Sequence, residues 1–269
     1  MKRKFKLGVI GCGFMASAII KGVVLSDFLN AKKVIVSDVL EENLDKIDEF
    51  GVYTCNSNKY VAENSEYLLI AVKPQNFQAV IKSLDGFKPE KVISVMAGVS
   101  KLTIKEKLGA YNIKVARCMP NLPCSIGSGA IGIDMSDFND DMDDTDFISN
   151  IFNNIGVVLS LDESKLNAVT GISGSGPAYA FMFIDSLIDA GVRQGLTQDE
   201  AKVLAVQTVL GAAEMVQRDE MPLSDLIMQV CSKGGTTIEA VKVLEENNFR
   251  GTVSKAVTAC VKRAKELSQ

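Results

Sequence analysis

The chain contains no histidine among its 269 residues, and this absence removes several kinds of site. Histidine is the commonest general base in enzymes, and it activates the nucleophile in Ser-His and Cys-His pairs. The six cysteines include no CxxC pair, and no histidine is present to complete a zinc site. We therefore expect no metal, chemistry without imidazole, and reduced, mostly buried thiols in a cytoplasmic protein.

The sequence also lacks a strong net charge and a long apolar run. Its formal net charge is only -4, which creates no field that would gather nucleic acid. The apolar run before Cys12 is shorter than the roughly 7 to 15 residues of an export signal. No run free of charge approaches the roughly 20 residues that span a bilayer. We expect a soluble protein with neither nucleic acid nor a membrane as partner.

Two hydrophobic patterns divide the chain. From Lys6 to about Ser160, helical stretches alternate with the β-rich runs LGVIG, KVIVSD, YLLIAVK, KVISVMAG and VARCMP. This alternation predicts βαβ crossovers and a doubly wound parallel sheet. After Asp162 the pattern is helical, with a capping box at Thr197 and Glu200 and a helix end at Gly195. The sequence predicts an α/β domain with a doubly wound parallel sheet over residues 1–160 and an all-α domain over residues 161–269.

An acidic stretch, DMSDFNDDMDDTD at residues 134 to 146, invites comparison with a calcium-binding loop. Asp137, Asn139 and Asp141 fit the first three ligand positions of such a loop. Met142 stands where the turn needs glycine, and Ile148 stands where a bidentate glutamate is needed. We interpret the stretch as a solvated surface loop.

The segment LGVIGCGFMASAII carries a GxGxxA pattern between the first strand and the helix that follows it. Gly11 permits the tight turn, Gly13 lets the backbone approach a pyrophosphate, and Ala16 allows close packing of helix on strand. Asp38 is placed to accept hydrogen bonds from the adenine ribose of NADH, whereas Ser37 could donate to the 2′-phosphate of NADPH. No arginine follows Asp38, so the residues favour NADH, although both cofactors stay open.

Two further strand ends should border the same cofactor, because ligands of open α/β sheets bind at the carboxyl ends of the strands. AVKPQ brings Lys73 to this edge, either as a cofactor contact or as a solvated lysine, and MAG brings Gly98 beside the nicotinamide. The expected cofactor-binding residues are Ile10, Gly11, Cys12, Gly13, Phe14, Met15, Ser37, Asp38, Asn58, Ala71, Val72, Lys73, Pro74, Met96, Ala97 and Gly98.

The helical half contains a second predicted anion site in CSKGGTT, residues 231 to 237. Its two glycines would expose backbone NH groups, and a helix is expected to begin at Thr236. The lysine precedes the glycines, so no Walker frame exists and an NTPase is excluded. The residues alone do not identify the anion.

The segment GISGSGPAYAFMFI matches the GxxGxG that opens the active-site helix of β-hydroxyacid dehydrogenases. Ala180 and Ile184 stand where those enzymes have a lysine and an asparagine. Because alcohol oxidation needs a group that takes the hydroxyl proton, this site is poorly equipped for alcohols.

Taken in order, the segments resemble those of pyrroline-5-carboxylate reductases nearly from end to end. They are GCGFMA, AVKPQ, VISVMAGVS, RCMPNLP, TGISGSGPAYAFMF, LAVQTVLGAA, GGTT and NFRG. The resemblance implies a Rossmann domain followed by a dimerisation domain like the C-terminal domain of 6-phosphogluconate dehydrogenase. It also implies a homodimer, often assembled further into a ring of dimers. The implied reaction is the reduction of 1-pyrroline-5-carboxylate to L-proline by NADPH or NADH, the final step of proline biosynthesis.

The resemblance also assigns roles to the loop in the helical half. Thr237 would contact the ring nitrogen and act as the catalytic residue, while the role of Lys233, which replaces a usual proline, stays open. The residues that would bind the substrate are Ser232, Gly234, Gly235, Thr236 and Thr237. The alternatives are a related NAD(P)-dependent imine or hydroxyacid reductase, and a non-catalytic nucleotide-binding sensor.

Overall fold

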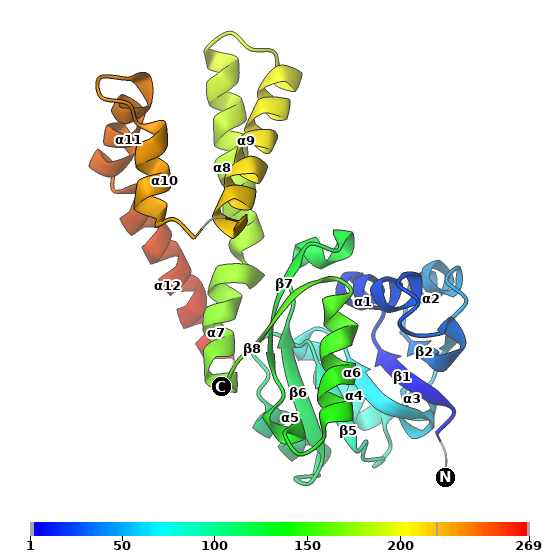
Figure 1. Cartoon of the computed structure of the whole chain (residues 1–269). Helices are drawn as coiled ribbons and strands as arrows, with labels where there is room; N and C mark the ends of the chain where they lie inside the picture. Colours follow the sequence, from blue (N-terminus) through cyan, green and yellow to red (C-terminus); the bar gives the residue numbers. More distant parts are fainter. Residues whose placement is uncertain (1–2, 219, 268–269) are drawn as a thin grey trace. The chain divides into compact units, whose positions relative to one another are not determined.

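The computed structural model describes residues 3–218 and 220–267, which form two compact units. One unit comprises Met1–Ser175 together with Cys260–Gln269, and the other comprises Gly176–Ala259. The first is built on a β-sheet and the second consists of helices (Figure 1). Within the described ranges, no helix has the length and apolar character needed to cross a membrane.

An eight-stranded sheet organises the first unit in the order β3-β2-β1-β4-β5-β6-β7-β8. The first six strands are parallel and follow the Rossmann order. β7 runs antiparallel to β6, and β8 runs parallel to β7. The strands are β1 Phe5–Ile10, β2 Val34–Ser37, β3 Tyr53–Cys55, β4 Ser65–Ile70, β5 Lys91–Ser94, β6 Lys114–Met119, β7 Gly129–Asp134 and β8 Gly156–Ser160. The predicted doubly wound class is confirmed, although β3, β7 and β8 were not predicted.

Helices cover both faces of this sheet. Along β4, Tyr67 and Leu69 enter one buried cluster, whereas Leu68 and Ile70 enter the cluster on the other face. All four side chains are buried because successive residues of a strand point to opposite faces, and both faces are covered. The α-helices that lie wholly within this unit are α1 Phe14–Leu25, α2 Glu41–Asp48, α3 Asn58–Asn64, α4 Phe77–Ser83, α5 Lys101–Leu108, α6 Met142–Asn153 and α7 Leu166–Val169.

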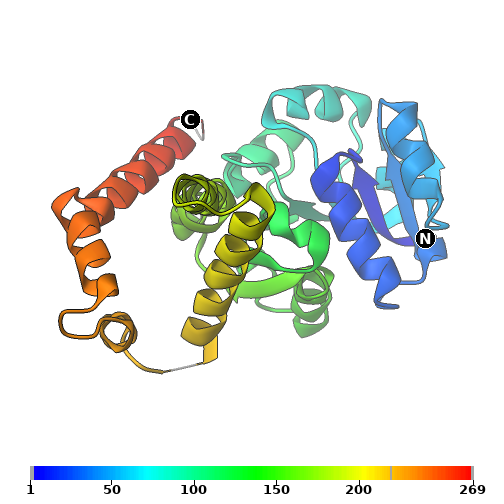
Figure 2. The same cartoon turned by 90° about the horizontal axis from the view of Figure 1, so that it is seen from above.

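The second unit is helical, as predicted. Its helices are α8 Gly176–Arg193, α9 Gln198–Arg218, α10 Leu223–Val230, α11 Thr236–Glu246 and most of α12 Phe249–Leu267 (Figure 2). The backbone N–H of Thr197 donates to Glu200 at 2.8 Å, and the N–H of Glu200 donates to the Thr197 hydroxyl at 3.3 Å, so the capping box is confirmed. Gly195, at φ +101°, follows the end of α8 in the left-handed region.

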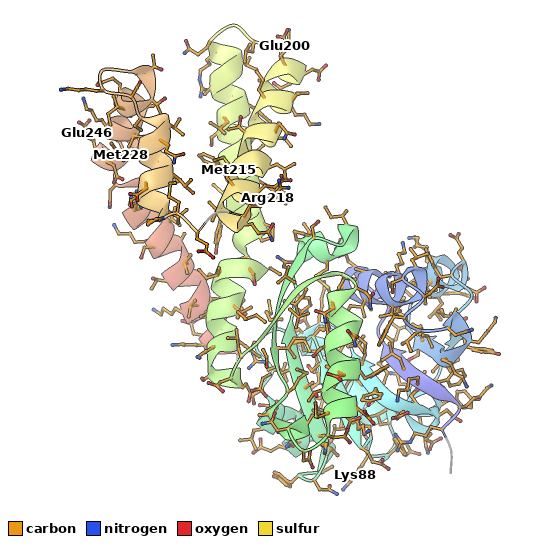
Figure 3. All side chains as sticks on the ribbon, in the orientation of Figure 1. Lys88, Glu200, Met215, Arg218, Met228 and Glu246 are labelled. Atoms are coloured by element: carbon orange, nitrogen blue, oxygen red, sulfur yellow. The ribbon has the colours of Figure 1, made fainter. Side chains whose placement is uncertain are left out.

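This helical unit leaves much apolar surface exposed. Its buried cluster consists of Ile188, Ala201 and Ala205, packed between α8 and α9. Met215 on α9 and Met228 on α10, both labelled in Figure 3, are 53% and 60% exposed. Such surface on several helices of one unit is typical of a face that another protein surface covers.

The acidic stretch is not a solvated loop, and that interpretation was wrong. Asp134 ends β7, and Asp144 lies in the first turn of α6, which Asp141 caps. Both Asp134 and Asp144 are buried because lysines distant in sequence neutralise them: Lys101 lies 2.5 Å from Asp134, and Lys91 lies 2.5 Å from Asp144. Sequence composition alone does not show these partners.

Candidate cofactor and substrate sites

The strand register brings the predicted cofactor residues of the first unit to one edge of the sheet. Ile10 is in register with Ser37 on one side and with Ile70 on the other, and Ile70 is in register with Ser94. The segments that follow these four strand ends therefore leave the sheet at the same level. They carry the glycine loop, Asp38, the AVKP segment and the MAG segment. This is the edge where open α/β sheets bind ligands.

The glycine loop has the geometry that a pyrophosphate requires. Gly11 adopts φ +91°, and a Cβ built there would lie 2.9 Å from the Ala71 carbonyl oxygen. A Cβ on Gly13 would meet nothing within 4 Å, so the bare backbone faces open space directly before α1. Ala16 is fully buried, which permits close packing of helix on sheet. These residues fit a dinucleotide at the amino end of α1.

Asp38 is held by the backbone on both sides. Its Oδ2 accepts from the Cys12 N–H at 2.5 Å, and its Oδ1 accepts from the Leu40 N–H at 2.8 Å. Through these two hydrogen bonds, the Asp38 carboxylate links the glycine loop to Leu40, the N-cap residue of α2. Burial, together with the charge of Asp38, raises the pKa of the Cys12 thiol, so the loop carries no thiolate.

Ser37 and Asn58 belong to one hydrogen-bond chain beside this carboxylate. The Ser37 hydroxyl donates to the Asn58 side-chain oxygen at 2.7 Å, and the Asn58 amide donates to the Ser83 hydroxyl at 2.8 Å. Ser83 in turn donates to the Val80 carbonyl at 2.7 Å. The sequence analysis did not identify Ser83, because it arrives from the end of α4 and no local pattern marks it.

A cavity of about 530 Å³ lies next to this chain. It opens where β2 and β3 end, which is the predicted position of the adenine ribose. Its lining residues are Asp38, Val39, Glu41, Asn56, Ser57, Asn58 and Ser83. Of these, the sequence analysis named only Asp38 and Asn58 as site residues.

The other two strand ends differ in exposure. Lys73 is exposed, and no carboxylate of the described chain pairs with it. After β5, Met96 is buried, Ala97 is exposed, and Gly98 adopts φ +77°. Both segments lie at the same edge of the sheet as the glycine loop, which we call the cofactor edge, as the strand register requires.

In the helical unit, the GGTT loop has the predicted local structure. α11 begins at Thr236, as expected, and Gly235 is its N-cap. Gly234 adopts φ +73°, and the Gly235 N–H donates to the Ser232 carbonyl at 3.0 Å. Within the described chain, the hydroxyls of Thr236 and Thr237 have no hydrogen-bond partner. A helix amino end with free hydroxyls suits a carboxylate.

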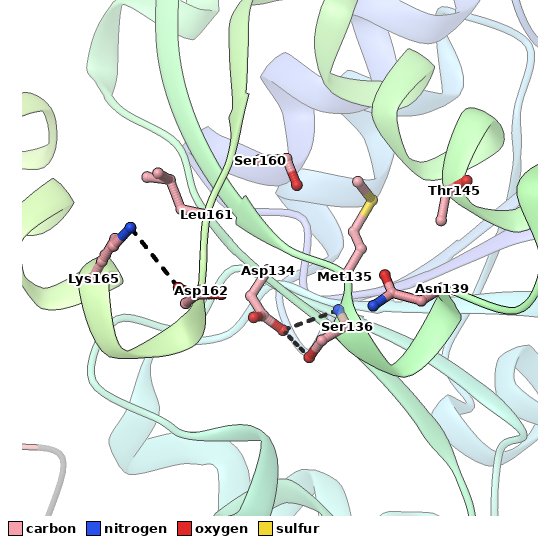
Figure 4. A pocket seen from close by; sticks show the side chains of 9 residues that line it. All are labelled: Asp134, Met135, Ser136, Asn139, Thr145, Ser160, Leu161, Asp162 and Lys165. Carbon is pink, nitrogen blue, oxygen red and sulfur yellow. Dashed lines mark hydrogen bonds and ion pairs between the residues drawn. The ribbon is translucent and has the colours of Figure 1, made fainter.

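A second cavity, of about 510 Å³, lies at the other end of the sheet, where β7 and β8 finish (Figure 4). Ser136 donates to Asp134 at 3.0 Å, and Lys165 lies 3.8 Å from Asp162. Two pairs of its polar side chains thus interact with each other, and the cavity contains none of the predicted site residues.

Comparison with known proteins identifies the relatives of this chain. Residues 163–267 match the model of pyrroline-5-carboxylate reductase dimerisation, and residues 6–98 match a model described as NADP oxidoreductase coenzyme F420-dependent. The pyrroline-5-carboxylate reductase of Aquifex aeolicus is 34% identical, with 97% of each chain covered. That of Escherichia coli is 35% identical, with 98% of each chain covered.

Solved structures agree with these matches. A pyrroline-5-carboxylate reductase from Coxiella burnetii superposes with a TM-score of 0.90 at 35% identity, covering 99% of both chains. The Plasmodium falciparum pyrroline carboxylate reductase, solved with NADP bound, gives a TM-score of 0.89 at 30% identity, covering 100% of both chains. The chain belongs to the pyrroline-5-carboxylate reductase family.

Proposed function

We propose that this protein reduces 1-pyrroline-5-carboxylate to L-proline with a reduced nicotinamide dinucleotide, as the final step of proline biosynthesis. The observation that carries the proposal is the presence of both predicted loops within a match that spans nearly the whole chain. The glycine loop has an open backbone at Gly13, and the GGTT loop opens α11 with free hydroxyls. A nucleotide sensor would need only the first of these loops.

The cofactor supplies a hydride when bound, and the chain supplies its position. The amino end of α1 and the backbone of residues 11–13 would hold the pyrophosphate, while Asp38 would accept from ribose hydroxyls. The AVKP and MAG segments would border the nicotinamide, with Met96, Ala97 and Gly98 on one side. Fixed placement of two reactants can supply effective molarities of about 10⁵ to 10⁸ M.

The substrate needs little chemistry from side chains. Its C=N carbon is already electrophilic when the ring nitrogen is protonated, so a histidine is not required. Ser232, Gly234, Gly235 and Thr236 would hold the ring carboxylate at the amino end of α11, and the Thr237 hydroxyl would orient the ring nitrogen. Lys233 is exposed and adds a positive charge beside this carboxylate position.

We further propose that the helical unit assembles two copies into a homodimer, and that dimers associate into a ring. Its exposed apolar side chains and the matched dimerisation model support the dimer. The proposed boundary between the cofactor domain and the substrate and dimerisation domain lies at residue 160, since β8 ends there. All six cysteines are free, which supports a reducing compartment, the cytoplasm.

Steady-state kinetics of Thr237→Ala and Thr237→Ser test the assignment of the substrate loop. We expect the alanine variant to lose roughly 10²-fold or more in kcat with 1-pyrroline-5-carboxylate. A side chain positioned for proton transfer to or from a reacting group contributes about 10²- to 10⁴-fold to the rate. The serine variant keeps the hydroxyl and should recover most of the rate. Unchanged kinetics in Thr237→Ala would remove this residue from the mechanism.

A further inference from the structure

The cavity beside the ribose position, lined by Asp38, Val39 and Glu41, contains negative charge and no balancing positive charge. None of its described lining residues is a lysine or an arginine. The 2′-phosphate of NADPH would enter this cavity, whereas NADH presents only a hydroxyl there. A cavity with this charge would repel the phosphate of NADPH but not the hydroxyl of NADH.

Asp38 cannot easily turn away from a phosphate. Both carboxylate oxygens accept backbone hydrogen bonds, at 2.5 Å from Cys12 and 2.8 Å from Leu40. Swinging the side chain aside would break both bonds and would leave the Cys12 N–H of the glycine loop unpaired. A ribose hydroxyl can still donate to either oxygen, because each carboxylate oxygen accepts more than one hydrogen bond.

The Ser37 hydroxyl, which the sequence analysis named as a possible donor to the 2′-phosphate, is already engaged. The Ser37 hydroxyl is buried, and it donates its hydrogen bond to the Asn58 side-chain oxygen at 2.7 Å. The amino end of α2 would also attract an anion, but Glu41 and Glu42 occupy its first turn. Glu42 pairs with Lys46 at 2.6 Å, whereas no cation of the described chain pairs with Glu41.

We infer that Asp38 and Glu41 together make this reductase selective for NADH, with Asp38 as the fixed ribose acceptor and Glu41 as an added barrier to the 2′-phosphate. The inference rests on the proposed use of a nicotinamide dinucleotide and specifies which one. Val39 is 94% exposed on the same rim, which makes it the position where a single added cation would reduce the preference for NADH.

Direct binding tests this selectivity without turnover. The fluorescence of NADH and of NADPH is titrated with the purified full chain, giving a dissociation constant for each. We expect wild-type protein to bind NADH at least about tenfold more tightly, since like-charge juxtaposition costs several kcal/mol and 1.4 kcal/mol is tenfold. Val39→Arg and Glu41→Gln should each tighten NADPH binding by roughly fivefold while changing NADH binding by less than about twofold.

Asp45→Asn is the matched control, because it removes a carboxylate from α2 one turn beyond Glu41, outside the cavity lining. Its NADH to NADPH ratio should equal that of the wild type. NADPH binding as tight as NADH binding in the wild type, or Glu41→Gln and Val39→Arg without effect on the ratio, would overturn the inference and leave the proposed reduction intact. Failure of both nucleotides to bind folded protein would overturn both.

Discussion

The two units of this molecule differ in how much of their apolar surface they bury themselves. The sheet unit has two large buried clusters, one on each face, which include fully buried side chains such as Leu7, Leu69 and Ile70. Among its described residues, the helical unit has a single small cluster, while Val203 and Met182 are 68% and 71% exposed. The sheet unit can therefore hold a cofactor edge in place by its own core, whereas the helical unit requires a further surface to cover its helices.

The largest effect should follow from charging the exposed apolar face of α9. In Val203→Glu/Leu210→Glu, two carboxylates seven residues apart lie on one side of the helix, and their burial in a dimer would be unfavourable. We expect self-association to weaken by roughly 10³-fold, about 4 kcal/mol. Sedimentation equilibrium would measure it, with Lys202→Glu as the control on the same helix. A wild type that is monomeric, or a double variant of unchanged mass, would contradict the proposed role of this unit.

The next largest effect concerns the charged cluster inside the sheet unit. Burial alone would raise the pKa of Asp134, but its bonds to Lys101 and Ser136 outweigh this effect and lower it. A lowered folded-state pKa stabilises the protein above the unfolded value of about 3.9, and this stability is lost as pH falls through the folded pKa. Chemical denaturation across pH 2 to 6, roughly the window where such carboxylates titrate, should show this loss in the wild type.

Asp134→Asn should lower the free energy of unfolding by about 3 kcal/mol at neutral pH, because it leaves Lys101 with one buried partner fewer. The variant should also show a shallower dependence on pH in the acidic window. Equal slopes for wild type and variant would mean that Asp134 does not contribute to the acid transition.

Gly11→Ala tests whether cofactor binding depends on the glycine loop itself or is weakened by backbone strain anywhere in the unit. A Cβ there would contact the Ala71 carbonyl, so we expect the variant to lose about 1–3 kcal/mol of stability and to bind dinucleotide at least tenfold more weakly. Gly109→Ala is the matched control: it also has positive φ, at +59°, but it ends α5 away from the cofactor edge. Cofactor binding that changes equally in both variants would show that the effect of Gly11 is not local.

The smallest effect is expected at the surface of the helical unit. Glu214 and Arg218 form an exposed pair at 3.1 Å along α9. Glu214→Gln should change stability by no more than about 0.5 kcal/mol, as is usual for such pairs. A thermal melt would check this value, and a loss of several degrees would indicate that Glu214 lies in a buried interface.

The sequence predicted those loops and helix ends whose structure is set by a few neighbouring residues. The GxGxxA loop, the capping box at Thr197 and the start of α11 at Thr236 were all predicted, because each depends on a few consecutive residues. The roles of Ser83 and Asp134 were not predicted, because their partners Asn58 and Lys101 are 25 and more than 30 residues away in sequence. The three-residue strand β3, YTC, carries too little hydrophobic pattern to be recognised, whereas the run GVVLS of β8 is β-rich and could have been predicted from the sequence.

The most direct test of the proposed reaction follows the transferred hydrogen. The purified protein is incubated with 1-pyrroline-5-carboxylate and with NADH that carries deuterium at the transferred position of the nicotinamide, and the product is analysed by mass spectrometry and NMR. We expect L-proline with a single deuterium on Cδ, the carbon of the former C=N bond. Proline that carries no deuterium, or no proline at all from folded protein that binds the cofactor, would contradict direct hydride transfer to this imine.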